Sequence, residues 1–352
     1  MSITRRGKLA AGAVTLLVVV GTLGYFTLFP ENAPAVIRTA MDRMGLAHAA
    51  APEPPPATCP LTGVNAPKDA IPPRPALAIK VENHPLARPQ AGLNDADIVY
   101  EEPVEGGLTR FIAVFQCSSS DRVGPVRSGR TTDPNVLRQF GPAIFGYAGG
   151  VPIVKREVPR AGLTDVNYII AASAYTRDPA RAAPHNLYTS TVALRKAARS
   201  DAGAPSPVFS YALELSQKSR KAREVHLPFS GYSDVYWRWS ARSSAWLRWH
   251  GTVPHTVEGN EQVSATNVVV QVVGVSASSI IDAAGNPSPE VDLVGSGKAY
   301  VFRDGRMIVG RWERPTLDDL TRFVTRDGEQ IALAPGRTWV ELLPESVPVQ
   351  IG

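Results

Sequence analysis

Short apolar segments separated by polar turns follow one another through the first half of the 352-residue chain. Segments 77–81, 97–101 and 110–116 have the length and the β-branched or aromatic content of strands. In segment 110–116 both alternating sets of positions are apolar, which predicts a central strand covered on both faces. Shorter strands are predicted at 143–148 and 168–171, and helices at 135–140 and 191–199. The pattern predicts a mixed α/β domain in which strands outnumber helices.

After residue 205 the pattern becomes typical of antiparallel β structure. Asp304-Gly305 and Asp327-Gly328 are strong hairpin signals. Trp237 and Trp239 share one face of their segment, which favours a place in a β-layer core over a stacking platform for sugars. The predicted strands of this half share alternating or continuous apolar content; they lie at 233–250 (two strands around a turn), 267–275, 298–312, 321–333 and 338–343. We expect a mainly antiparallel β-rich second domain.

An apolar run at 9–29 contains 21 residues without a charge. As a helix this run is long enough to span about 30 Å of hydrocarbon. Arg5, Arg6 and Lys8 precede it, so the positive-inside rule keeps the N-terminus in the cytoplasm. We expect a transmembrane signal anchor, with a twin-arginine signal or cleavage after Ala49 as alternative interpretations.

The predicted organisation follows from these patterns. It places a single-pass protein in the cell membrane, with the bulk of the chain extracytoplasmic. The successive parts are a cytoplasmic N-terminus at 1–8, the anchor at 9–29, a Pro/Ala-rich juxtamembrane linker at 30–58, an α/β domain at 59–205 and a β-rich domain at 206–352.

The distribution of charge argues against a nucleic-acid partner. The net charge is +5, but residues 58–352 alone carry 32 basic and 29 acidic side chains, a net charge of +3. Basic residues outnumber acidic ones by 17 to 13 in 58–205, but not in 206–352, where the numbers are 15 and 16. We therefore expect affinity for anions in the first domain.

Cys59 and Cys117 are the two cysteines of the chain. Outside the cytoplasm such a pair is expected to form a disulfide. The bond would tie the start of the first domain to the end of its central strand and close a loop of about 59 residues. Two cysteines are too few for a structural zinc site, and the sequence predicts no metal site and no cofactor.

The segment VGPVRSGRTTDP places Arg127 and Arg130 three residues apart, directly before a predicted helix. Asp133 fits the N-cap of that helix. Free N–H groups at a helix start, together with two guanidinium groups, suit a carboxylate or a phosphate, and Ser128 allows close approach of the backbone. The alternative interpretation is that both arginines form structural ion pairs with nearby glutamates.

Other polar residues near the predicted strand ends complete the set of candidates. Glu101, Glu105 and His185 are candidate catalytic residues, although charges beside a turn and a single histidine are more often structural. The sequence contains no known catalytic motif. The candidate ligand-binding residues share a place in polar loops or at strand ends; they are Arg127, Ser128, Arg130, Arg110, Arg88, Glu82, Asn83, His84 and Asn186.

Several polar segments occur in a recognisable order. They are CPLTG (59–63), ENHPLARPQAGLNDADIVYEEPVEGGLTRF (82–111), VGPVRSGR (123–130) and APHNLYTS (183–190). This series resembles the YerB-like lipoprotein family, and the resemblance covers the chain from Cys59 onward. It implies an envelope-attached protein with a layered ββα first domain and a C-terminal partner domain, and it supplies no reaction. The chain differs from lipoprotein members because an apolar run stands in place of an acylated cysteine.

Two main hypotheses for function remain open. The first is a non-catalytic, membrane-anchored envelope protein that binds an anionic cell-wall component or a partner protein through its arginines. The second is an enzyme acting on a phosphorylated or glycan substrate, since the order of strand, arginine loop and strand resembles the layout of LytR-CpsA-Psr glycopolymer transferases. In that case Glu101 or Asp133 would hold a divalent metal and His185 would transfer protons. A purely mechanical role as a spacer is a third possibility.

Overall fold

The computed structural model describes residues 56–352 apart from 283 and 284, together with Tyr25, Pro34 and Thr39. The chain divides into two units, Met1–Pro55 and Pro56–Gly352. The second of these, called the folded unit below, contains both halves in which separate domains were expected.

The N-terminal parts of the expected organisation fall mostly in the first unit. The segments 1–8 and 9–29 and most of the linker at 30–58 lie outside the described residues. Within the part of the chain that the structure describes, no helix is both long and apolar enough to cross a membrane.

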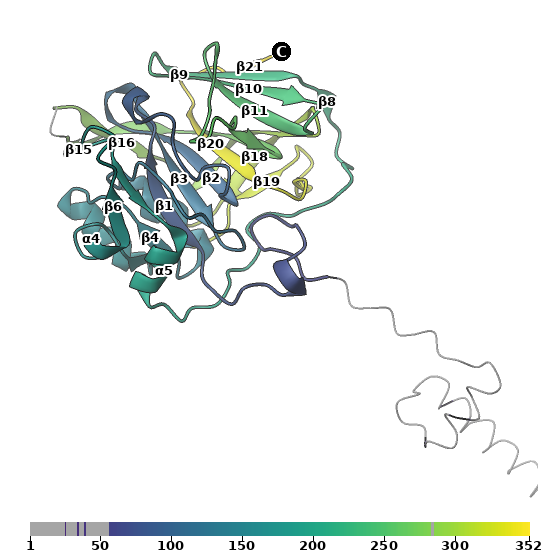
Figure 1. The fold of residues 1–352 in the computed structure, drawn as a ribbon. Helices are drawn as coiled ribbons and strands as arrows, with labels where there is room; N and C mark the ends of the chain where they lie inside the picture. The colour runs from purple at the N-terminus through teal and green to yellow at the C-terminus, as the bar shows by residue number, and fades with distance from the viewer. Residues whose placement is uncertain (1–24, 26–33, 35–38, 40–55, 283–284) are drawn as a thin grey trace, which may run out of the picture. The chain divides into compact units, whose positions relative to one another are not determined.

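A large sheet of eleven strands runs through residues 56–352 and takes strands from both halves of the folded unit (Figure 1). The short β8 (Arg220–Lys221) pairs with β18 beside the main path. The other strands follow one another in the spatial order β19 (Arg322–Val324), β18 (Arg306–Arg314), β17 (Gly295–Arg303), β14 (Asn267–Val273), β20 (Thr338–Pro344), β2 (Ile98–Pro103), β3 (Thr109–Phe115), β1 (Leu77–Glu82), β4 (Ile144–Gly146) and β5 (Thr164–Asp165).

A second, smaller sheet and two hairpins complete the β structure of residues 56–352. The second sheet contains β12 (Val253–Pro254), β11 (Ala245–His250), β10 (Ser233–Ser240), β9 (Glu224–Ser230) and β21 (Gln350–Ile351), with β13 (Ser264–Ala265) paired to β11. The hairpins are β15 (Val275–Ile281) with β16 (Pro287–Val291), and β6 (Tyr175–Arg177) with β7 (Leu187–Thr189).

The helices of the folded unit are short and belong to its first half. The α-helices are α3 (Thr132–Leu137), α4 (Pro152–Arg160) and α5 (Thr191–Ala198). Single 3-10 turns are η2 (Pro67–Asp69), η3 (Pro85–Ala87), η4 (Glu105–Gly107), η5 (Arg138–Phe140) and η6 (Ala172–Ala174). The expected mixed α/β first half and mainly antiparallel β second half are confirmed.

Strand β20 joins the two halves into one sheet. It runs parallel to β2 on one side, where Ile98 pairs with Thr338, and parallel to β14 on the other side, where Val268 pairs with Trp339. Its residues Thr338 to Leu343 are all buried. Parallel neighbours require long connections, so this pairing could not be read from local hairpin signals.

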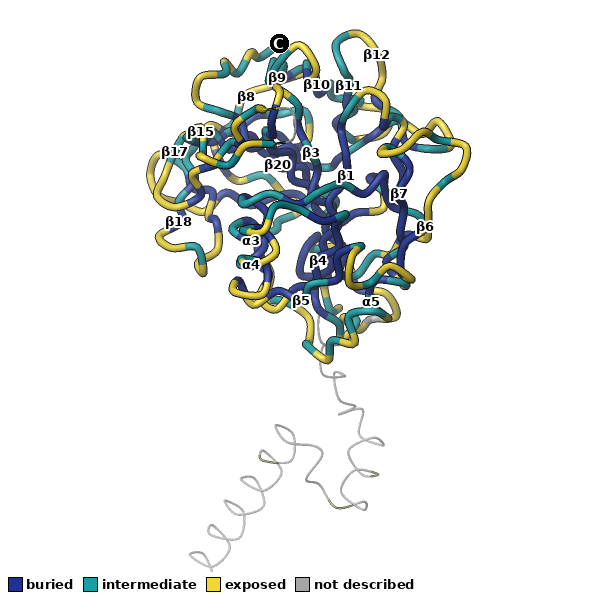
Figure 2. Tube along the Cα trace, turned by 90° about the vertical axis from the view of Figure 1, so that its left-hand side faces the viewer, coloured by how far each residue is buried: buried dark blue, intermediate teal, exposed yellow. Residues whose placement is uncertain are grey.

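The two faces of the large sheet carry separate hydrophobic cores. One face, which includes Ala78 and Ile112, packs against α3 and α4 through Val136 and Val154. The other face packs against the second sheet and α5; its core includes Leu194 and the fully buried Trp237 and Trp246. The expected core role of Trp237 is confirmed, and Figure 2 shows the central strands buried beneath more exposed loops and helices.

One local expectation for the first half was wrong, and one helix of this half was not predicted. Residues 168–171 form a turn instead of a strand, and Ile169 and Ile170 in this turn are each 64% exposed. Helix α4 was not predicted, although Val154 and Val158 lie one turn apart on its buried face. Its proline-punctuated sequence begins with Pro152 at the first helical position, where a missing N–H costs nothing, and carries Pro159 in the last turn.

The expected disulfide between Cys59 and Cys117 is confirmed, with Cα atoms 6.0 Å apart. Cys117 follows the end of β3, so the bond fastens the start of the folded unit to a central strand. The two cysteines are separated by 58 residues in the sequence, and closing a loop of that length restricts the unfolded chain strongly.

Replacing both cysteines, as Cys59→Ser with Cys117→Ser, should lower the free energy of unfolding by about 4 kcal/mol, because the unfolded chain regains the entropy of the open loop. Urea unfolding of the variant and the wild type would measure the difference. Wild-type protein unfolded in the presence of a thiol reductant should show the same decrease in the free energy of unfolding. Equal midpoints for all samples would contradict a stabilising role for this bond.

Candidate functional site

One end of the large sheet presents a row of charged side chains on the face that α3 covers. In the register of β1, β3 and β2, Glu82 pairs with Arg110, and Arg110 pairs with Glu102. Because side chains alternate along a strand, Lys80 projects from the same face as Glu82. Strands β1, β3 and β2 thus bring four charged side chains together from positions that lie apart in the sequence. The cations are Lys80 and Arg110, and the carboxylates are Glu82 and Glu102.

Lys80, Glu102 and Asp133 form a fully buried charged cluster beneath helix α3. The Lys80 ammonium donates to Oε1 of Glu102 and lies 2.6 Å from Oδ1 of Asp133. The second oxygen of Glu102 has no hydrogen-bond partner among the described residues. Burial and then the neighbouring charge of Asp133 raise the pKa of Glu102 to about 7, against the opposing effect of Lys80. One ammonium group is thus shared by two buried carboxylates, and the raised pKa of Glu102 reflects this imbalance of charge.

The loop between Arg127 and Arg130 lies over this row of charges. The Arg127 amide donates to the carbonyl of Lys80 at 2.9 Å, and the Arg130 amide donates to Oδ2 of Asp133 at 2.6 Å. A side chain at Gly129 would meet the ring of Tyr147 at 3.1 Å, so the close approach of the loop favours glycine there. The loop is therefore fixed through its backbone, and its arginines project from a rigid base.

Each loop arginine has a glutamate partner. Nε of Arg127 lies 3.0 Å from Oε1 of Glu82, and Nη2 of Arg130 lies 2.6 Å from Oε2 of Glu105. Glu105 also accepts a hydrogen bond from the hydroxyl of Ser288 in β16. Burial alone would raise the pKa of Glu105, but the hydrogen bonds from Arg130 and Ser288 outweigh it and hold that pKa below its ordinary value. These contacts match the structural ion pairs that the sequence left open as an alternative.

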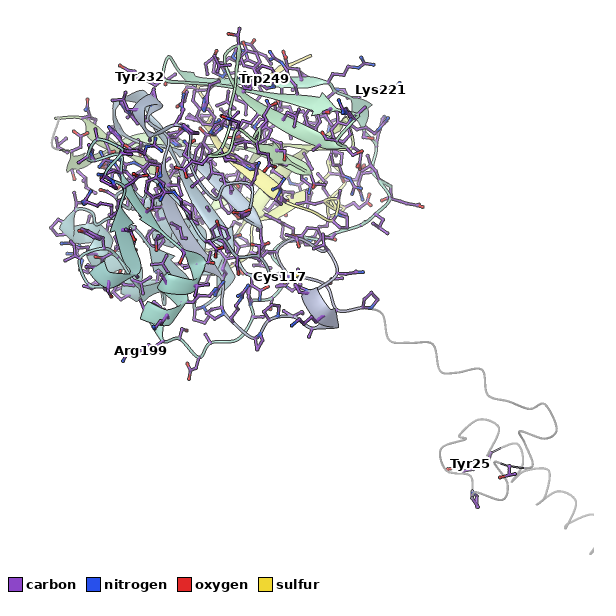
Figure 3. All side chains as sticks on the ribbon, in the orientation of Figure 1. Tyr25, Cys117, Arg199, Lys221, Tyr232 and Trp249 are labelled. Atoms are coloured by element: carbon purple, nitrogen blue, oxygen red, sulfur yellow. A yellow bond between two sulfur atoms is a disulfide. The ribbon has the colours of Figure 1, made fainter. Side chains whose placement is uncertain are left out.

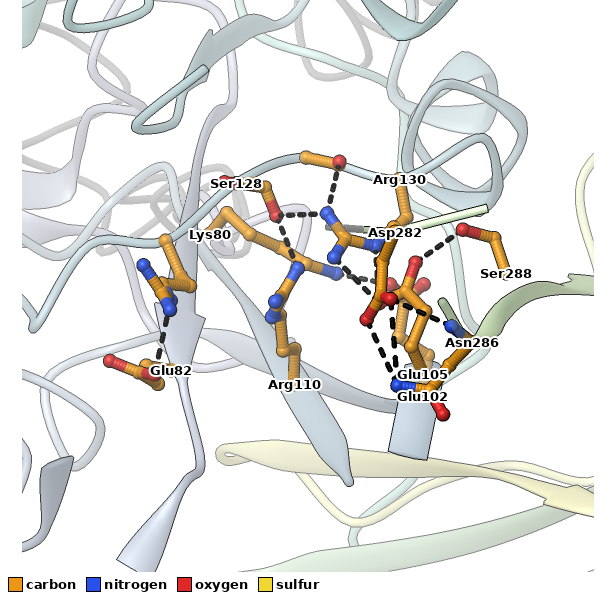
Figure 4. Close-up of polar contacts among 12 residues, drawn as sticks. Lys80, Glu82, Glu102, Glu105, Arg110, Ser128, Arg130, Asp282, Asn286 and Ser288 are labelled. Carbon is orange, nitrogen blue, oxygen red and sulfur yellow. Dashed lines mark hydrogen bonds and ion pairs between the residues drawn. The ribbon is translucent and has the colours of Figure 1, made fainter. Parts of the chain in front are cut away.

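Arg110 differs from the two loop arginines because, among the described residues, no carboxylate lies within ion-pair distance of it. Its Nη1 donates to the carbonyl of Ser128 at 2.9 Å (Figure 4). Burial, followed by the charge of Arg130, lowers the pKa of Arg110 to about 9. Arg110 is half-buried and faces a cavity of about 480 Å³, called the arginine cavity below. The cavity is lined by Glu105, Arg110, Arg127, Ser128, Arg130, Gly150, Val151, Asp282 and Ser288.

His185 and His84 lie beside the arginine cavity without lining it. Nδ1 of His185 is 2.9 Å from Oε2 of Glu82, so Glu82 is shared between His185 and Arg127. The rings of the two histidines stack with centroids 5.0 Å apart. Burial, followed by the charge of His185, lowers the pKa of His84. The contact with Glu82 orients the His185 ring next to the arginines.

The remaining sequence candidates lie elsewhere. Glu101 points to the opposite face of the sheet, where its Oε2 lies 2.5 Å from Nη2 of the buried Arg248. Asn83 donates to Glu101 at 3.2 Å, and Arg88 donates to Oδ1 of Asn83 at 3.2 Å. Asn186 accepts from Arg177 and donates to backbone carbonyls within its own loop. Glu101, Asn83, Arg88 and Asn186 therefore lie apart from the arginine cavity.

The carboxylates considered for a metal are also separated. Glu101 contacts Arg248 on one face of the sheet, and Asp133 contacts Lys80 on the other. Asp133 lies inside the first turn of α3, whose N-cap is Thr131, so the N-cap assignment for Asp133 was wrong. The side chain of Asp133 instead holds the loop amide of Arg130 and the buried Lys80.

Sequence reasoning missed three residues of this site: Lys80, Glu102 and Ser288. A lysine inside the otherwise apolar segment LAIKV was the available signal for Lys80, because an unpaired charge in a buried strand is costly. Glu102 follows the candidate Glu101 directly, and alternation along a strand shows that only one of the two can face a given site, but not which one. Ser288 lies in the second half, and no feature of the sequence connects it to Glu105.

Substituting Glu102→Gln should make the stability of the protein less dependent on pH. The folded chain holds the Glu102 proton more tightly than the unfolded chain, whose carboxyl has the ordinary value of 4.5 instead of about 7. The folded state therefore binds the extra proton between these values, and the free energy of unfolding falls as pH rises through this window. The loss should be on the order of 2–3 kcal/mol in the wild type.

Urea unfolding at several pH values from 5 to 8 would measure this effect. The Gln variant should show a flatter dependence, because its amide accepts from Lys80 and does not titrate. The exposed Glu290→Gln is a matched control and should follow the wild type. If Glu102→Gln and Glu290→Gln gave the same pH dependence, titration of Glu102 would not control stability.

Comparisons with known proteins agree with the resemblance seen in the sequence. Residues 61–204 match the family model "Protein of unknown function (DUF3048) N-terminal domain", and residues 225–340 match the corresponding C-terminal domain. The Bacillus subtilis (strain 168) protein "Putative lipoprotein YerB" is 30% identical over 296 residues, which cover 81% of this chain and 86% of that protein.

A solved structure is also similar to this chain. It is the crystal structure of the YerB protein from Bacillus subtilis, which matches with a TM-score of 0.70 and 27% identity over 84% of this chain and 99% of that chain. The fold, the order of the two matched regions and the sequence identity lead to one conclusion: this chain belongs to the DUF3048 family of YerB-like proteins.

Proposed function

We propose that this protein is anchored in the cell membrane, lies mainly outside the cytoplasm, and binds an anionic group of an envelope ligand or partner protein in the arginine cavity. The observation that carries the binding part of the proposal is Arg110, a half-buried guanidinium group that faces this cavity without a carboxylate partner among the described residues.

Support for the membrane location comes from the apolar run at 9–29 and from the name of the relative. The run is long enough to cross a membrane as a helix, although it lies outside the described residues. The Bacillus subtilis relative is named "Putative lipoprotein YerB", a name that describes attachment to a membrane. In this chain no cysteine follows the run before Cys59, so a signal anchor takes the place of lipid attachment.

Support for an anionic ligand comes from the arrangement of the three arginines. Arg127 and Arg130 are held by Glu82 and Glu105, whereas Arg110 lies between them with a single hydrogen bond to a backbone carbonyl. Guanidinium groups offer paired N–H donors that match carboxylate and phosphate oxygens. An anion beside Arg110 would supply the counter-charge that it lacks.

The size and rigidity of the cavity suit a compact group. Its volume of about 480 Å³ falls within the range of small-molecule sites. Arg127 and Arg130 are already held in place by ion pairs and by the loop backbone, so little side-chain entropy is lost when a ligand binds. Glu105 and Asp282 also line the cavity, and their charges favour a ligand with one or two anionic groups over a polyanion.

Substituting Arg110→Gln should weaken binding of an anion by about ten- to a hundredfold, the size expected from losing one charge-assisted contact. The probe is inorganic pyrophosphate, titrated calorimetrically into the detergent-solubilised full chain. Arg156→Gln is the matched control, because Arg156 is exposed on α4 and lies outside the cavity. Equal affinities for Arg110→Gln and Arg156→Gln would exclude Arg110 as the binding group.

The stability of the unliganded Arg110→Gln variant provides a second readout. A half-buried cation without a carboxylate partner costs free energy, so removing its charge should leave the protein as stable as the wild type or more stable. A loss of several kcal/mol in urea unfolding would assign Arg110 a structural role instead of a binding role.

A further inference from the structure

We infer that the folded unit docks onto an anionic membrane surface through helix α5 and the neighbouring turn, and that the arginine cavity then faces away from the membrane. The docking surface, called the α5 patch, consists of Ile170, Val192, Lys196 and Arg199. The inference rests on the proposed membrane anchoring, to which it adds the orientation of the folded unit. It does not depend on what the cavity binds.

The chain enters the folded unit at the same end as the α5 patch. Residues 1–55 lead into the folded unit at Pro56, and Cys59 is bonded to Cys117 just after the end of β3. Helix α5 contacts the same region. Arg195 donates to the carbonyl of Phe115, the last residue of β3, at 2.9 Å, and the Thr191 hydroxyl lies 3.1 Å from the carbonyl of Ser120.

The outer face of α5 combines apolar and basic side chains. Val192 and Lys196 are four residues apart and project from one side of the helix, opposite the buried Leu194. Arg199 follows as the C-cap residue in the left-handed region and lines the same groove as Lys196. Val192 is 63% exposed, and Ile170 in the adjacent turn is 64% exposed. A groove of about 690 Å³ between the helix and this turn is lined by Ile170, Ala174, Ala193, Lys196, Ala197 and Arg199.

The charges of the α5 patch have no counterpart within the folded unit. Among the described residues, neither Lys196 nor Arg199 has an ion pair with a carboxylate. Residues 191–201 contain three basic side chains and a single acidic one, Asp201. A face with exposed aliphatic side chains and unpaired cations is typical of surfaces that lie at the boundary of an anionic bilayer.

The arginine cavity lies at the far end of the central strands. Arg110 is the second residue of β3 and Phe115 is the last, so about 17 Å of strand separates the cavity from the end that carries the α5 patch. Figure 3 shows Arg199 and Tyr232 at opposite ends of the folded unit. Docking at the α5 patch would therefore leave the cavity open toward the cell envelope.

Weak affinity is enough for this contact because the chain is tethered. Each basic side chain near an anionic surface strengthens its binding by about fivefold, and two aliphatic side chains add a modest hydrophobic contribution. A free domain with such a patch would bind vesicles poorly. A short tether raises the effective concentration of the surface, so the same weak contact becomes populated.

The test uses the full chain reconstituted in vesicles that contain brominated-chain lipids as quenchers. Because the described cysteines are joined in a disulfide, a Val192→Cys variant offers one free thiol for a fluorescent label, and Tyr232→Cys provides the label at the far end. Vesicles of phosphatidylcholine alone are compared with vesicles that also contain phosphatidylglycerol. Flotation of the vesicles measures anchoring in the same samples.

The label at 192 should be quenched in the presence of phosphatidylglycerol, and the label at 232 should not. Charge reversal by Lys196→Glu with Arg199→Glu should lower the ratio of docked to undocked chains by at least about 25-fold. Lys221→Glu, on an exposed strand at the other end, is the matched control and should leave quenching unchanged. Both reversed side chains are exposed, so the fold should be preserved.

The possible failures are distinguishable. If the chain floats with vesicles but the labels at 192 and 232 are quenched equally, docking through the α5 patch is excluded and anchoring stands. If the chain does not float, the anchoring is excluded and the docking with it. If the double charge reversal leaves quenching at 192 unchanged, the contact does not depend on Lys196 and Arg199, and the inferred surface is wrong.

Discussion

The pairing of strand β20 with both β2 and β14 is the interaction on which the rest of the structure depends. A strand in the middle of a sheet must find backbone partners on both sides, because unpaired N–H and C=O groups are costly when buried. β20 finds one partner in each half of the folded unit. The two halves consequently share the large sheet and the two cores on its faces.

This shared sheet also explains a buried polar network on the face opposite the arginine cavity. Glu341 of β20 lies beside Glu101 of β2 in the parallel register. Burial and the adjacent Glu101 raise the pKa of Glu341 well above its ordinary value, and Glu101 forms an ion pair with Arg248. The indole of Trp237 donates to Glu341 at 2.7 Å. The pairing of β20 with β2 thus places two carboxylates and one cation together at the interface between the sheets.

Around the arginine cavity the cations also contact carboxylates, with one exception. Lys80, Arg127 and Arg130 each contact a carboxylate, and the hairpin of the second half completes the set by placing Ser288 against Glu105. Arg110 is the cation that this arrangement leaves without a carboxylate among the described residues. This difference between Arg110 and the neighbouring cations is the basis of the proposed function.

The sequence by itself determined the elements whose signals are local. The strands around 77–81, 110–116 and 298–312 were predicted because alternation and hairpin turns depend on neighbouring residues. The disulfide was predicted because the chain has a single pair of cysteines. The resemblance carried by the four polar segments determined the family. Arg127 and Arg130 were selected as candidate ligand-binding residues from their local spacing, and both line the arginine cavity.

The tertiary structure alone decided which charges meet. Glu101 and Glu102 are neighbours in the sequence, yet they point to opposite faces because side chains alternate along a strand. Their partners, Arg248 and Lys80, lie on strands that come next to them only through sheet register and sheet packing. Spacing along the chain predicts which residues share a loop. Pairing between distant strands determines which of them share a site, and no local pattern encodes that pairing.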